Sequence, residues 1–351
     1  MEIINLNKEN EKVWDDYLEK NSRSSIFHTL EWKNIIEKTY NFKPLYFLAI
    51  NNNEVKGIIC SFLTSSLIFG KKIVSTPFNF YNQPLFEDEE AGNLLINKLK
   101  EIGLEEKVKY IELKALEDLK IQNNELKKHP HYFISNLKLE DTEEKIEAKY
   151  YDRLRKNLRT LRRNAEKNNI KVDFSDKEED LKQFYNVLVK IYRDKHNMIC
   201  QPYSLYKNMK EIFKERFKLL TAKENDKVIA GMILLFFKDQ AVYAYGASNL
   251  KYKTLSPGTV LIDYAIKFCS KNNYKTLDFG VTSQSQTELL SFKQNWGTTE
   301  HKMPYYYIPI TQKEINPPDY YTYMKNLRKP FKYVPLPIIK LTSPIITKQL
   351  G

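Results

Sequence analysis

The chain of 351 residues is long enough for two domains of ordinary size, each with a hydrophobic core of its own. Hydrophobic residues make up 42% and aromatic residues 13%, which excludes a disordered or low-complexity protein. The 56 Lys and Arg against 44 Asp and Glu give a formal net charge of +12, which favours anionic partners such as phosphates, nucleic acid or a membrane surface. A lysine-rich genome accounts for the excess equally well, and only local clustering distinguishes the two explanations.

The sequence lacks the signatures of secretion, membrane insertion and metal binding. The N-terminal stretch "MEIINLNKENEKVW" is charged from its second residue, and no apolar run approaches the roughly 20 residues of a membrane span. The three cysteines lie far apart, in or beside apolar runs, which is typical of reduced thiols. His129 and His131 flank Pro130 in an expected loop, a poor zinc site. We expect a cytoplasmic protein without a metal.

Residues 1–147 are predicted to combine helices with an antiparallel meander. A strand "EIINL" precedes helical patterns in "KVWDDYLEKN" and "LEWKNIIEKTY". Three apolar, β-branched segments follow, "PLYFLAI", "VKGIICSFLTS" and "KKIVSTPF", and a turn-prone run of asparagines joins the first two. A helix "EAGNLLINKLKEIGLEE" and a strand "VKYIELKAL" complete the order. This succession indicates an α/β layer structure.

Residues 170–310 repeat that order. The strand "IKVDFS" and two helices, "DLKQFYNVLVKIYRDKH" and "YSLYKNMKEIFKER", precede the strands "FKLLTAKEN", "KVIAGMILLFFK" and "AVYAYGAS". The helix through "TVLIDYAIKFCSKNN" is expected to have Ser256 as its N-cap and Pro257 at its first position. The strand "YKTLDFG", the helix "TELLSFKQNW" and the strand "HKMPYYYIPI" follow. Two similarly folded domains are expected, with residues 311–351 as a tail packed on the domain surface.

Residues 148–169 form the most charged segment and are predicted to be a helix that opens the second domain. Its apolar residues recur at helical spacing, namely Leu154, Leu158, Leu161 and Ala165. Basic residues follow the same spacing on a neighbouring face, namely Arg155, Lys156, Arg159, Arg162 and Arg163. Few acidic residues oppose them, so the positive run repels itself unless an anion neutralises it. The pattern favours an anion-binding helix, and a solvated face is the alternative.

The string "LDFGVTS" contains the Asp-Phe-Gly triplet that binds magnesium in protein kinases. A kinase also needs a glycine-rich phosphate loop, a strand lysine and a His-Arg-Asp loop, and a chain with 10 glycines carries none of these motifs. Asp278 is instead predicted to end a core strand beside a cleft, because ligands of open α/β layers gather at the carboxyl ends of strands. A loop-capping role for Asp278 and a turn at Gly280 are the alternative.

The longer string "DFGVTSQSQTELLSFKQNWGTTEHKMPYYYI" resembles the closing segment of FemAB-related acyltransferases, relatives of the peptidoglycan-bridge aminoacyltransferases. Further segments are similar to the family throughout the chain, among them "SSIFHTLEWKNII", "STPFNFYNQPLF", "RLRKNLRTLRRNAEKN", "YRDKHNM" and "SPGTVLIDYAI". The resemblance implies an α/β fold with two tandem GNAT-like domains, of the acyl-CoA N-acyltransferase type. Each domain is expected to be a mixed, largely antiparallel sheet flanked by helices.

The resemblance also implies a reaction, in which an amine of a cell-envelope peptide or glycan precursor attacks an activated acyl or aminoacyl carbonyl. No tightly bound cofactor is expected, and the donor is an aminoacyl-tRNA, an acyl-CoA or an acyl carrier. Lys293 occupies the position of the family's F-K lysine, which is expected to stabilise developing negative charge or the donor's phosphate. Asp278 and Tyr245 are candidates to orient or deprotonate the amine.

Further candidate residues contact the substrates. Candidate acceptor and substrate contacts are Phe292, Ser248, Ser283, Tyr81 and Asn82. Candidate phosphate or donor contacts are Arg155, Lys156, Arg159, Arg162 and Arg193.

Two features depart from the family pattern. Val281 follows Asp-Phe-Gly where many relatives carry a basic residue. The segment "KTLSPGT" has one glycine and a proline where coenzyme A enzymes offer a row of amide donors. Coenzyme A is therefore the less expected donor.

Two other interpretations compete with the enzyme. A non-catalytic nucleic-acid or anion-binding protein would use the basic helix of residues 148–169. Peripheral contact with an anionic membrane surface, at the inner face of the membrane, would use the apolar tail "YVPLPIIKLTSPII" and its flanking lysines. The proline spacing of that tail favours an irregular surface segment over an amphipathic helix.

Overall fold

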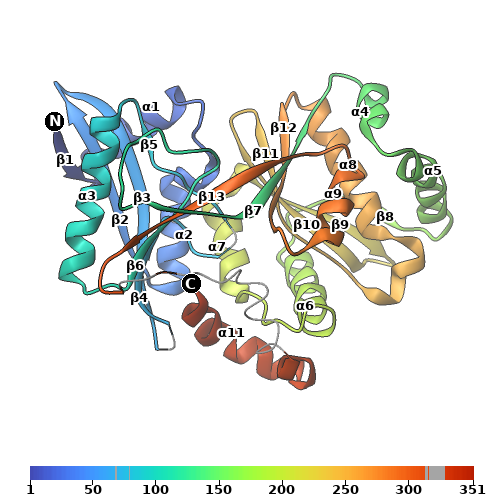
Figure 1. Cartoon of the computed structure of the whole chain (residues 1–351). Coiled ribbons are helices and arrows are strands. Elements are labelled where there is room, and N and C mark those ends of the chain that lie inside the picture. The colour runs from blue at the N-terminus through green and yellow to red at the C-terminus, as the bar shows by residue number, and fades with distance from the viewer. Residues whose placement is uncertain (68, 79, 313–314, 316–328) are drawn as a thin grey trace. The chain divides into compact units, whose positions relative to one another are not determined.

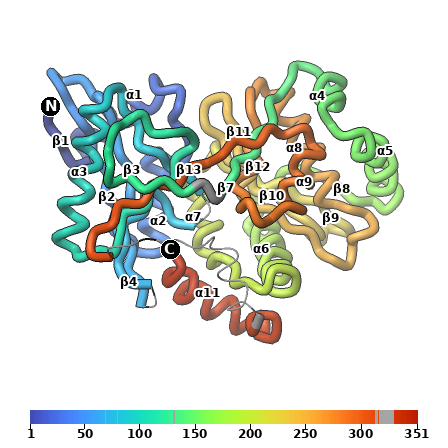
Figure 2. The backbone as a smooth tube through the Cα atoms, viewed as in Figure 1, coloured from blue at the N-terminus to red at the C-terminus, as the bar shows by residue number. Residues whose placement is uncertain are grey.

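The computed structural model describes residues 1–67, 69–78, 80–312, 315 and 329–351, and the chain divides into two compact units (Figure 1, Figure 2). Unit 1 takes the described residues of 1–133, 301–320 and 348–351, and unit 2 those of 134–300 and 321–347. These units differ from the predicted domain boundaries, which placed residues 170–310 together. The physical reason is strand pairing, because the last long strand of the chain is hydrogen-bonded to a strand of unit 1.

Unit 1 contains a meander, a helix and a returning parallel strand. Its elements are β1 (Glu2–Asn5), α1 (Glu11–Lys20), η1 (Ile26–His28), α2 (Leu30–Tyr40), β2 (Lys43–Asn51), β3 (Glu54–Ser66), β4 (Gly70–Val74), β5 (Leu85–Phe86), α3 (Glu89–Glu105), β6 (Tyr110–Lys114) and β13 (Thr299–Pro309). β1 to β4 pair antiparallel in sequence order, β6 pairs parallel with β4, and β13 pairs antiparallel with β6. β7 (Lys127–Lys138) begins in unit 1 and ends in unit 2.

Helices cover both faces of the sheet in unit 1. The apolar stripe of α3, which includes Leu95 and Leu99, packs in one core with Phe47 of β2. Its neighbour Tyr46 points to the opposite face, where its ring lies 5.3 Å from that of Trp14 in α1. Alternating side chains of one strand therefore serve two separate layers, which is the arrangement expected of an α/β sandwich.

Unit 2 repeats this order. Its elements are α4 (Glu143–Lys149), α5 (Asp152–Lys167), β8 (Lys171–Ser175), α6 (Glu178–Asp194), α7 (Tyr203–Phe213), η2 (Lys214–Arg216), β9 (Phe217–Glu224), β10 (Lys227–Phe237), β11 (Gln240–Ser248), η3 (Leu250–Leu255), α8 (Pro257–Lys271), β12 (Thr276–Ser283), α9 (Thr287–Gln294), η4 (Lys329–Tyr333) and α11 (Leu336–Leu350). β8 to β11 pair antiparallel in sequence order, and β12 pairs parallel with β11. The predicted repetition of one element order in two parts of the chain is therefore present.

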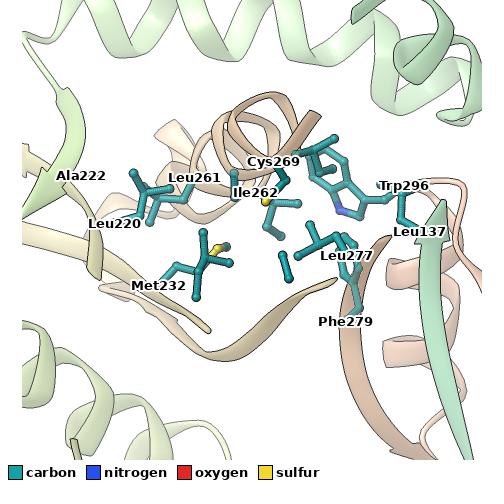
Figure 3. Close-up of a cluster of buried hydrophobic side chains, with 14 of the residues drawn as sticks. Leu137, Leu220, Ala222, Met232, Leu261, Ile262, Cys269, Leu277, Phe279 and Trp296 are labelled. Atoms are coloured by element: carbon teal, nitrogen blue, oxygen red, sulfur yellow. The ribbon is translucent and has the colours of Figure 1, made fainter. Parts of the chain in front are cut away.

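The sheet of unit 2 is also covered on both faces. Leu261 and Cys269 of α8 pack against Met232 and Leu277 of the strands, together with Trp296 (Figure 3). On the other face, a Cβ on Gly231 would lie 2.4 Å from the ring of Phe184 in α6, so this glycine permits close helix packing. All three cysteines are free and buried, as the apolar runs around them predict; they are Cys60, Cys200 and Cys269.

Two local predictions were wrong, and a third is confirmed in part. The expected loop around His129 lies within β7, although the side chain of His131 is outside the described part. Ser256 is the N-cap residue of α8 and Pro257 begins the helix, as predicted, but Ser256 has a φ of 45° and makes no capping bond with its side chain. The segment expected to be irregular is helical from Leu336, because α11 accommodates Pro337 in its first turn and Pro344 in its interior.

Candidate functional site

The candidate site begins where two parallel strands of unit 2 part. β11 and β12 pair over three positions, from Gln240 with Thr276 to Val242 with Asp278. β11 continues to Ser248 and β12 to Ser283, and these residues, all of them described, form no further ladder with each other. Beyond Val242 the edge of β11 therefore has backbone groups without a strand partner from β12, as a site for extended ligands requires.

A bulge coincides with this parting. Tyr243 pairs with Leu234 of β10 and Tyr245 pairs with Ile233, so Ala244 is an extra residue in β11. A bulge bends and twists a strand locally, which turns β11 away from its parallel neighbour. The split of the two strands thus has a cause in the pairing with β10.

Lys293 lies at this split. It belongs to α9 and is 5% exposed. Its Nζ donates to the carbonyl oxygen of Gly280 at 2.7 Å and to Oγ1 of Thr282 at 2.6 Å. Burial lowers the pKa of Lys293 to about 8, and the negative charges of Asp278 and Glu300 oppose this only in part. The ammonium of Lys293 therefore deprotonates near physiological pH, which is a property typical of catalytic lysines.

Asp278 supports a kink in β12 next to this lysine. Its carboxylate Oδ1 accepts a hydrogen bond from the backbone N–H of Gly280 at 2.6 Å, and the side chain is buried. Gly280 has a φ of +80°, which a residue with a Cβ rarely adopts. The predicted strand end at Asp278 and turn at Gly280 were wrong, because β12 continues through both residues to Ser283. The capping contact of Asp278 is present, and it helps to aim the Gly280 carbonyl at Lys293.

The end of α9 is held by the motif "FKQNWG". Trp296 is fully buried, and its ring meets Tyr150 edge-on at 5.2 Å. Gly297 has a φ of +76°, and a Cβ there would lie 2.6 Å from the carbonyl oxygen of Lys149. The Trp-Gly pair therefore anchors α9, and so positions Lys293, against the segment that leads into α5.

The other predicted site residues of unit 2 lie on elements around the split, but they do not all contact one another. Tyr245 follows the bulge, is buried, and packs edge-on against Tyr206 at 4.9 Å. The hydroxyl of Ser248 lies at the start of α8, where a Cβ on Gly258 would be 2.5 Å from it. Ser283 ends β12 and shares a hydrogen bond of 2.8 Å with Ser285. Phe292 is 39% exposed on α9, on a different side of the helix from Lys293.

Tyr81 and Asn82 belong to the interior of unit 1. Tyr81 is 4% exposed, and its ring lies 5.2 Å from that of Phe27. Asn82 is fully buried, and its Nδ2 donates to the carbonyl oxygen of Phe27 at 2.7 Å. The Tyr81 ring and the Asn82 amide therefore contribute to the packing of unit 1, whatever further role they have.

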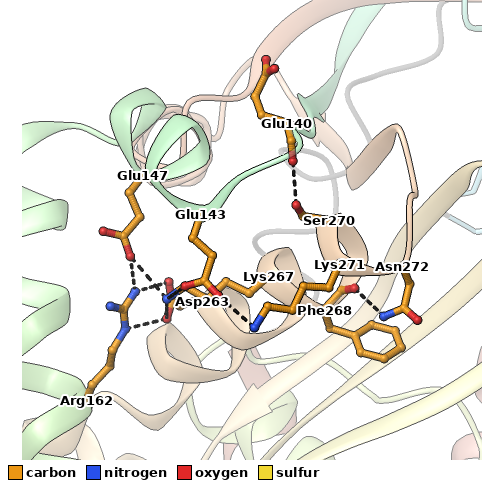
Figure 4. Close-up of polar contacts among 10 residues, drawn as sticks. All are labelled: Glu140, Glu143, Glu147, Arg162, Asp263, Lys267, Phe268, Ser270, Lys271 and Asn272. Carbon is orange, nitrogen blue, oxygen red and sulfur yellow. Dashed lines mark hydrogen bonds and ion pairs between the residues drawn. The ribbon is translucent and has the colours of Figure 1, made fainter.

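The basic helix α5 divides its charges between two faces. Arg162 is bidentate to Asp263, with distances of 2.8 Å and 2.7 Å, and its Nη2 also contacts Glu147 at 2.7 Å (Figure 4). Lys267 and Lys271 extend this network and lower the pKa of Glu143 to about 2. The sequence comparison of charges within α5 could not reveal these partners, because Glu147 belongs to α4 and Asp263 to α8. Arg162 is thus neutralised within the fold.

The outward face of α5 is different. Its exposed cations form no hydrogen bond or ion pair within the described chain; they are Arg153, Lys156, Arg159, Arg163 and Lys167. Arg155 pairs with Asp152 one turn earlier. Arg193 lies on α6, where it contacts Asp194 at 2.6 Å and the carbonyl oxygen of Val334 at 3.4 Å. The predicted phosphate-binding set is therefore split, and Lys156 and Arg159 remain available to an anion.

Comparison with known proteins assigns the domain around this site. Residues 152–302 match the family described as the acetyltransferase (GNAT) domain. Unit 2 carries a GNAT acetyltransferase domain. The matched segment runs from α5 to β13 and so includes the split of β11 and β12, Asp278 and Lys293. A search of curated proteins found no match.

Solved structures extend the likeness to the whole fold. FemX superposes with a TM-score of 0.67 at 14% identity, covering 88% of this chain and 97% of FemX. A tandem GNAT protein of the clavulanic acid biosynthesis pathway gives 0.57 at 8% identity, with 89% and 99% covered. The C-terminal domain of a putative lysylphosphatidylglycerol synthetase from Agrobacterium fabrum gives 0.55 at 10% identity, with 92% and 97% covered.

These likenesses confirm the predicted fold and enzyme class. The chain has the FemX-like, tandem GNAT fold, with a mixed, largely antiparallel sheet and flanking helices, and through its GNAT domain it is an N-acyltransferase. Within the described ranges, every helix is too short or too polar to cross a membrane. The described residues also contain no group of three His, Cys, Asp or Glu side chains placed to hold a metal ion.

Proposed function

We propose that the chain transfers an acyl or aminoacyl group to an amine of a cell-envelope peptide or glycan precursor. The observation that carries the proposal is Lys293, a buried amine with a pKa of about 8 beside the parted ends of β11 and β12. A surface lysine of α9 would have neither the burial nor two fixed acceptors. The sequence resemblance to FemAB-related enzymes and the FemX-like fold support the envelope acceptor.

In this proposal the acceptor amine attacks the donor carbonyl directly. A C–N bond forms while the bond from the carbonyl carbon to the donor's oxygen or sulfur breaks, and the amine's proton passes to the leaving group. Negative charge develops on the carbonyl oxygen, and Lys293 stabilises it as a cation. With a pKa of about 8, about nine-tenths of the lysine is protonated at pH 7, so the charge is present when the reaction needs it.

The residues around Lys293 position the reactants. Asp278 holds the kink of β12 at Gly280 and favours the charged form of the lysine through its own negative charge. Tyr245 follows the point at which β11 loses its parallel partner, so its backbone borders the open edge. Ser248, Ser283 and Phe292 lie on three elements around the split and remain the proposed substrate contacts.

An aminoacyl-tRNA is the donor that the chain supports best. The start of α8 is occupied by the Ser248 hydroxyl and begins with a proline, which leaves a poor cradle for the pyrophosphate of coenzyme A. The outward cations of α5, Lys156 and Arg159 among them, suit the phosphates of an RNA chain. The competing proposal of a non-catalytic nucleic-acid-binding protein uses the same cations, but it gives no role to the buried Lys293.

A donor assay tests the proposal. The full chain is incubated with envelope precursors and either charged tRNA or a pool of acyl-CoA compounds, and acylated products are identified by mass spectrometry. We expect product with charged tRNA and none with the Lys293→Met variant. Product from acyl-CoA alone would overturn the choice of donor. Absence of product with every donor, from protein that still binds tRNA, would overturn the enzyme and favour the binding protein.

A further inference from the structure

Helix α11 exposes an apolar face in addition to the face that it buries. Ile338, Leu341 and Ile345 are 49%, 78% and 67% exposed. Their spacing of three and four places them on one face of the helix. The buried face combines Ile339, which is 0% exposed, with the hydroxyl residues Ser343 and Thr347, which are 0% and 1% exposed. An apolar face of this kind on the outside of a protein marks a binding surface.

The orientation of α11 is fixed by a contact with the rest of unit 2. Ser343 Oγ donates to the carbonyl oxygen of Cys200, whereas Thr347 Oγ1 donates within the helix, to the carbonyl oxygen of Ser343 at 2.7 Å. Ile339 is fully buried one residue away from the exposed Ile338. Rotating α11 until its exposed apolar face is buried would break the hydrogen bond from Ser343 to Cys200 and would bury the exposed side chain of Lys340. The exposed stripe is therefore built into the fold.

The charge around the stripe identifies the kind of surface that covers it. Residues 329–351 contain four lysines and no aspartate or glutamate. Lys332 and Lys340 are exposed, although Lys340 also donates to Oδ1 of Asn186 in α6, and Tyr333, three residues before the helix, is 83% exposed. Aliphatic residues flanked by lysines and an aromatic residue are typical of helices that lie in the headgroup region of anionic bilayers. Protein interfaces instead concentrate aromatic and arginine residues at their centre.

We propose that the outward face of α11 docks on an anionic lipid surface. Ile338, Leu341 and Ile345 enter the boundary between headgroups and acyl chains, and Lys332 and Lys340 face lipid phosphates. The helix has 15 residues and a length of about 22 Å, so it lies in the membrane plane and does not span it. This docking is independent of the transfer reaction and brings the protein to the surface where envelope precursors linked to lipid would be found.

Vesicle co-sedimentation of the full chain tests the docking. We expect the protein to sediment with phosphatidylglycerol vesicles and much less with phosphatidylcholine vesicles. The Leu341→Ser, Ile345→Ser double variant should bind phosphatidylglycerol vesicles at least about tenfold more weakly, because its apolar contact is lost. Lys332→Gln with Lys340→Gln should weaken binding at low salt only, since at about 1 M salt the screening length is about 3 Å.

Matched variants separate α11 from the general positive charge. Leu104→Ser with Val13→Ser changes two exposed aliphatic side chains of unit 1, which are 62% and 40% exposed. This variant should leave vesicle binding unchanged. Arg159→Gln with Arg163→Gln removes two positive charges from α5, the same number that Lys332→Gln with Lys340→Gln removes from α11 and the turn before it. Equal thermal unfolding of all variants checks that the fold is intact, and the transfer activity of the α11 variants on a soluble acceptor should not change.

Three outcomes would overturn the proposal. The first is wild-type protein that stays in solution with anionic vesicles. The second is an α11 double variant that sediments as well as the wild type, or an α5 variant that loses as much binding as the α11 variants. The third is a wild-type dimer, seen by light scattering, that Leu341→Ser with Ile345→Ser turns into a monomer, since a second copy of the chain would then cover the stripe.

Discussion

Each unit buries a lysine near the end of its parallel strand, and the two lysines are satisfied in opposite ways. Lys114 of β6 lies 3.4 Å from the carboxylate of Glu112, donates to the carbonyl oxygen of Phe78, and faces the ring of Tyr305 at 5.6 Å. Lys293 has two neutral acceptors, and within the described chain no carboxylate lies at ion-pair distance. One lysine has an ion-pair partner inside the fold, whereas Asp278 and Glu300 compensate the charge of the other only in part.

The strand ends around these lysines differ in the same sense. In unit 1 the chain after β4 returns to β6, since Ser75 N donates to Glu112 O at 2.8 Å and Asn82 N donates to Lys114 O at 3.3 Å. The edge is thereby sealed. In unit 2 the pairing of β11 with β12 stops at Val242 and Asp278, and the described residues beyond these two form no further ladder between the strands. One element order thus yields a joined strand end in unit 1 and a parted strand pair in unit 2, and the lysine with neutral acceptors lies at the parted pair.

The largest effect should come from Lys293→Met. We expect transfer activity to fall by at least about a hundredfold, because the cation that stabilises the developing oxyanion is lost. Methionine matches the length of the lysine stem, so the packing of α9 should persist. Rates of product formation by mass spectrometry measure the loss, and thermal unfolding serves as the control. Retention of more than about a tenth of the wild-type rate would remove Lys293 from the chemistry.

The same variant should not lose stability. A pKa lowered from 10.5 to about 8 corresponds to a cost of about 3 kcal/mol at neutral pH, and the two hydrogen bonds return about 1 kcal/mol each. The free energy of unfolding should therefore rise by up to about 1 kcal/mol in Lys293→Met at pH 7. Between pH 8 and 10.5 the unfolded wild type binds the extra proton, so wild-type stability increases with pH and this advantage of the variant disappears.

Lys114→Met is the reverse case. The carboxylate of Glu112, whose side chain is 13% exposed, would lose its ion-pair partner. Because an unpaired buried charge is costly, we expect the free energy of unfolding to fall by about 2 to 3 kcal/mol. The rate per folded molecule should stay near the wild-type value, because Lys114 serves packing. Urea unfolding and the transfer assay measure the two quantities on one preparation. Unchanged stability with lost transfer would show that the lysine of unit 1 is functional as well.

The sequence predicted the elements of both units better than the contacts between them. Periodicity and turn residues located β11, β12 and α9, and the family resemblance singled out Lys293. Thr282 was missed, because "TSQSQT" carries no pattern and its contact with Lys293 arises only when α9 folds back on β12. Asp263 was missed as the partner of Arg162 because the two are 101 residues apart. Prolines misdirected two further predictions, at Pro130 in β7 and at Pro344 in α11.

The smallest expected effect tests how Lys293 is tuned. Thr282 Oγ1 accepts a hydrogen bond from the Lys293 ammonium at 2.6 Å, and the side chain is 1% exposed. Thr282→Val keeps the shape but removes the acceptor, so the charged lysine is less stable and its pKa falls further. A reaction that needs the cation loses rate as pH rises through this pKa, and the alkaline limb of the rate profile should move to lower pH by about half a unit to one unit.

At pH 7 the Thr282→Val rate should consequently drop by less than about twofold, because at least about half of the lysine is still protonated there. Thr282→Ser restores the oxygen and should restore the wild-type limb, which a loss of packing alone would not do. Profiles of kcat against pH for the three proteins, at saturating donor and acceptor, make the comparison. A limb that stays at the wild-type pH in Thr282→Val would mean that another group titrates there. A limb that rises with pH would make Lys293 act as a neutral base, because the proton would then have to leave before the reaction proceeds.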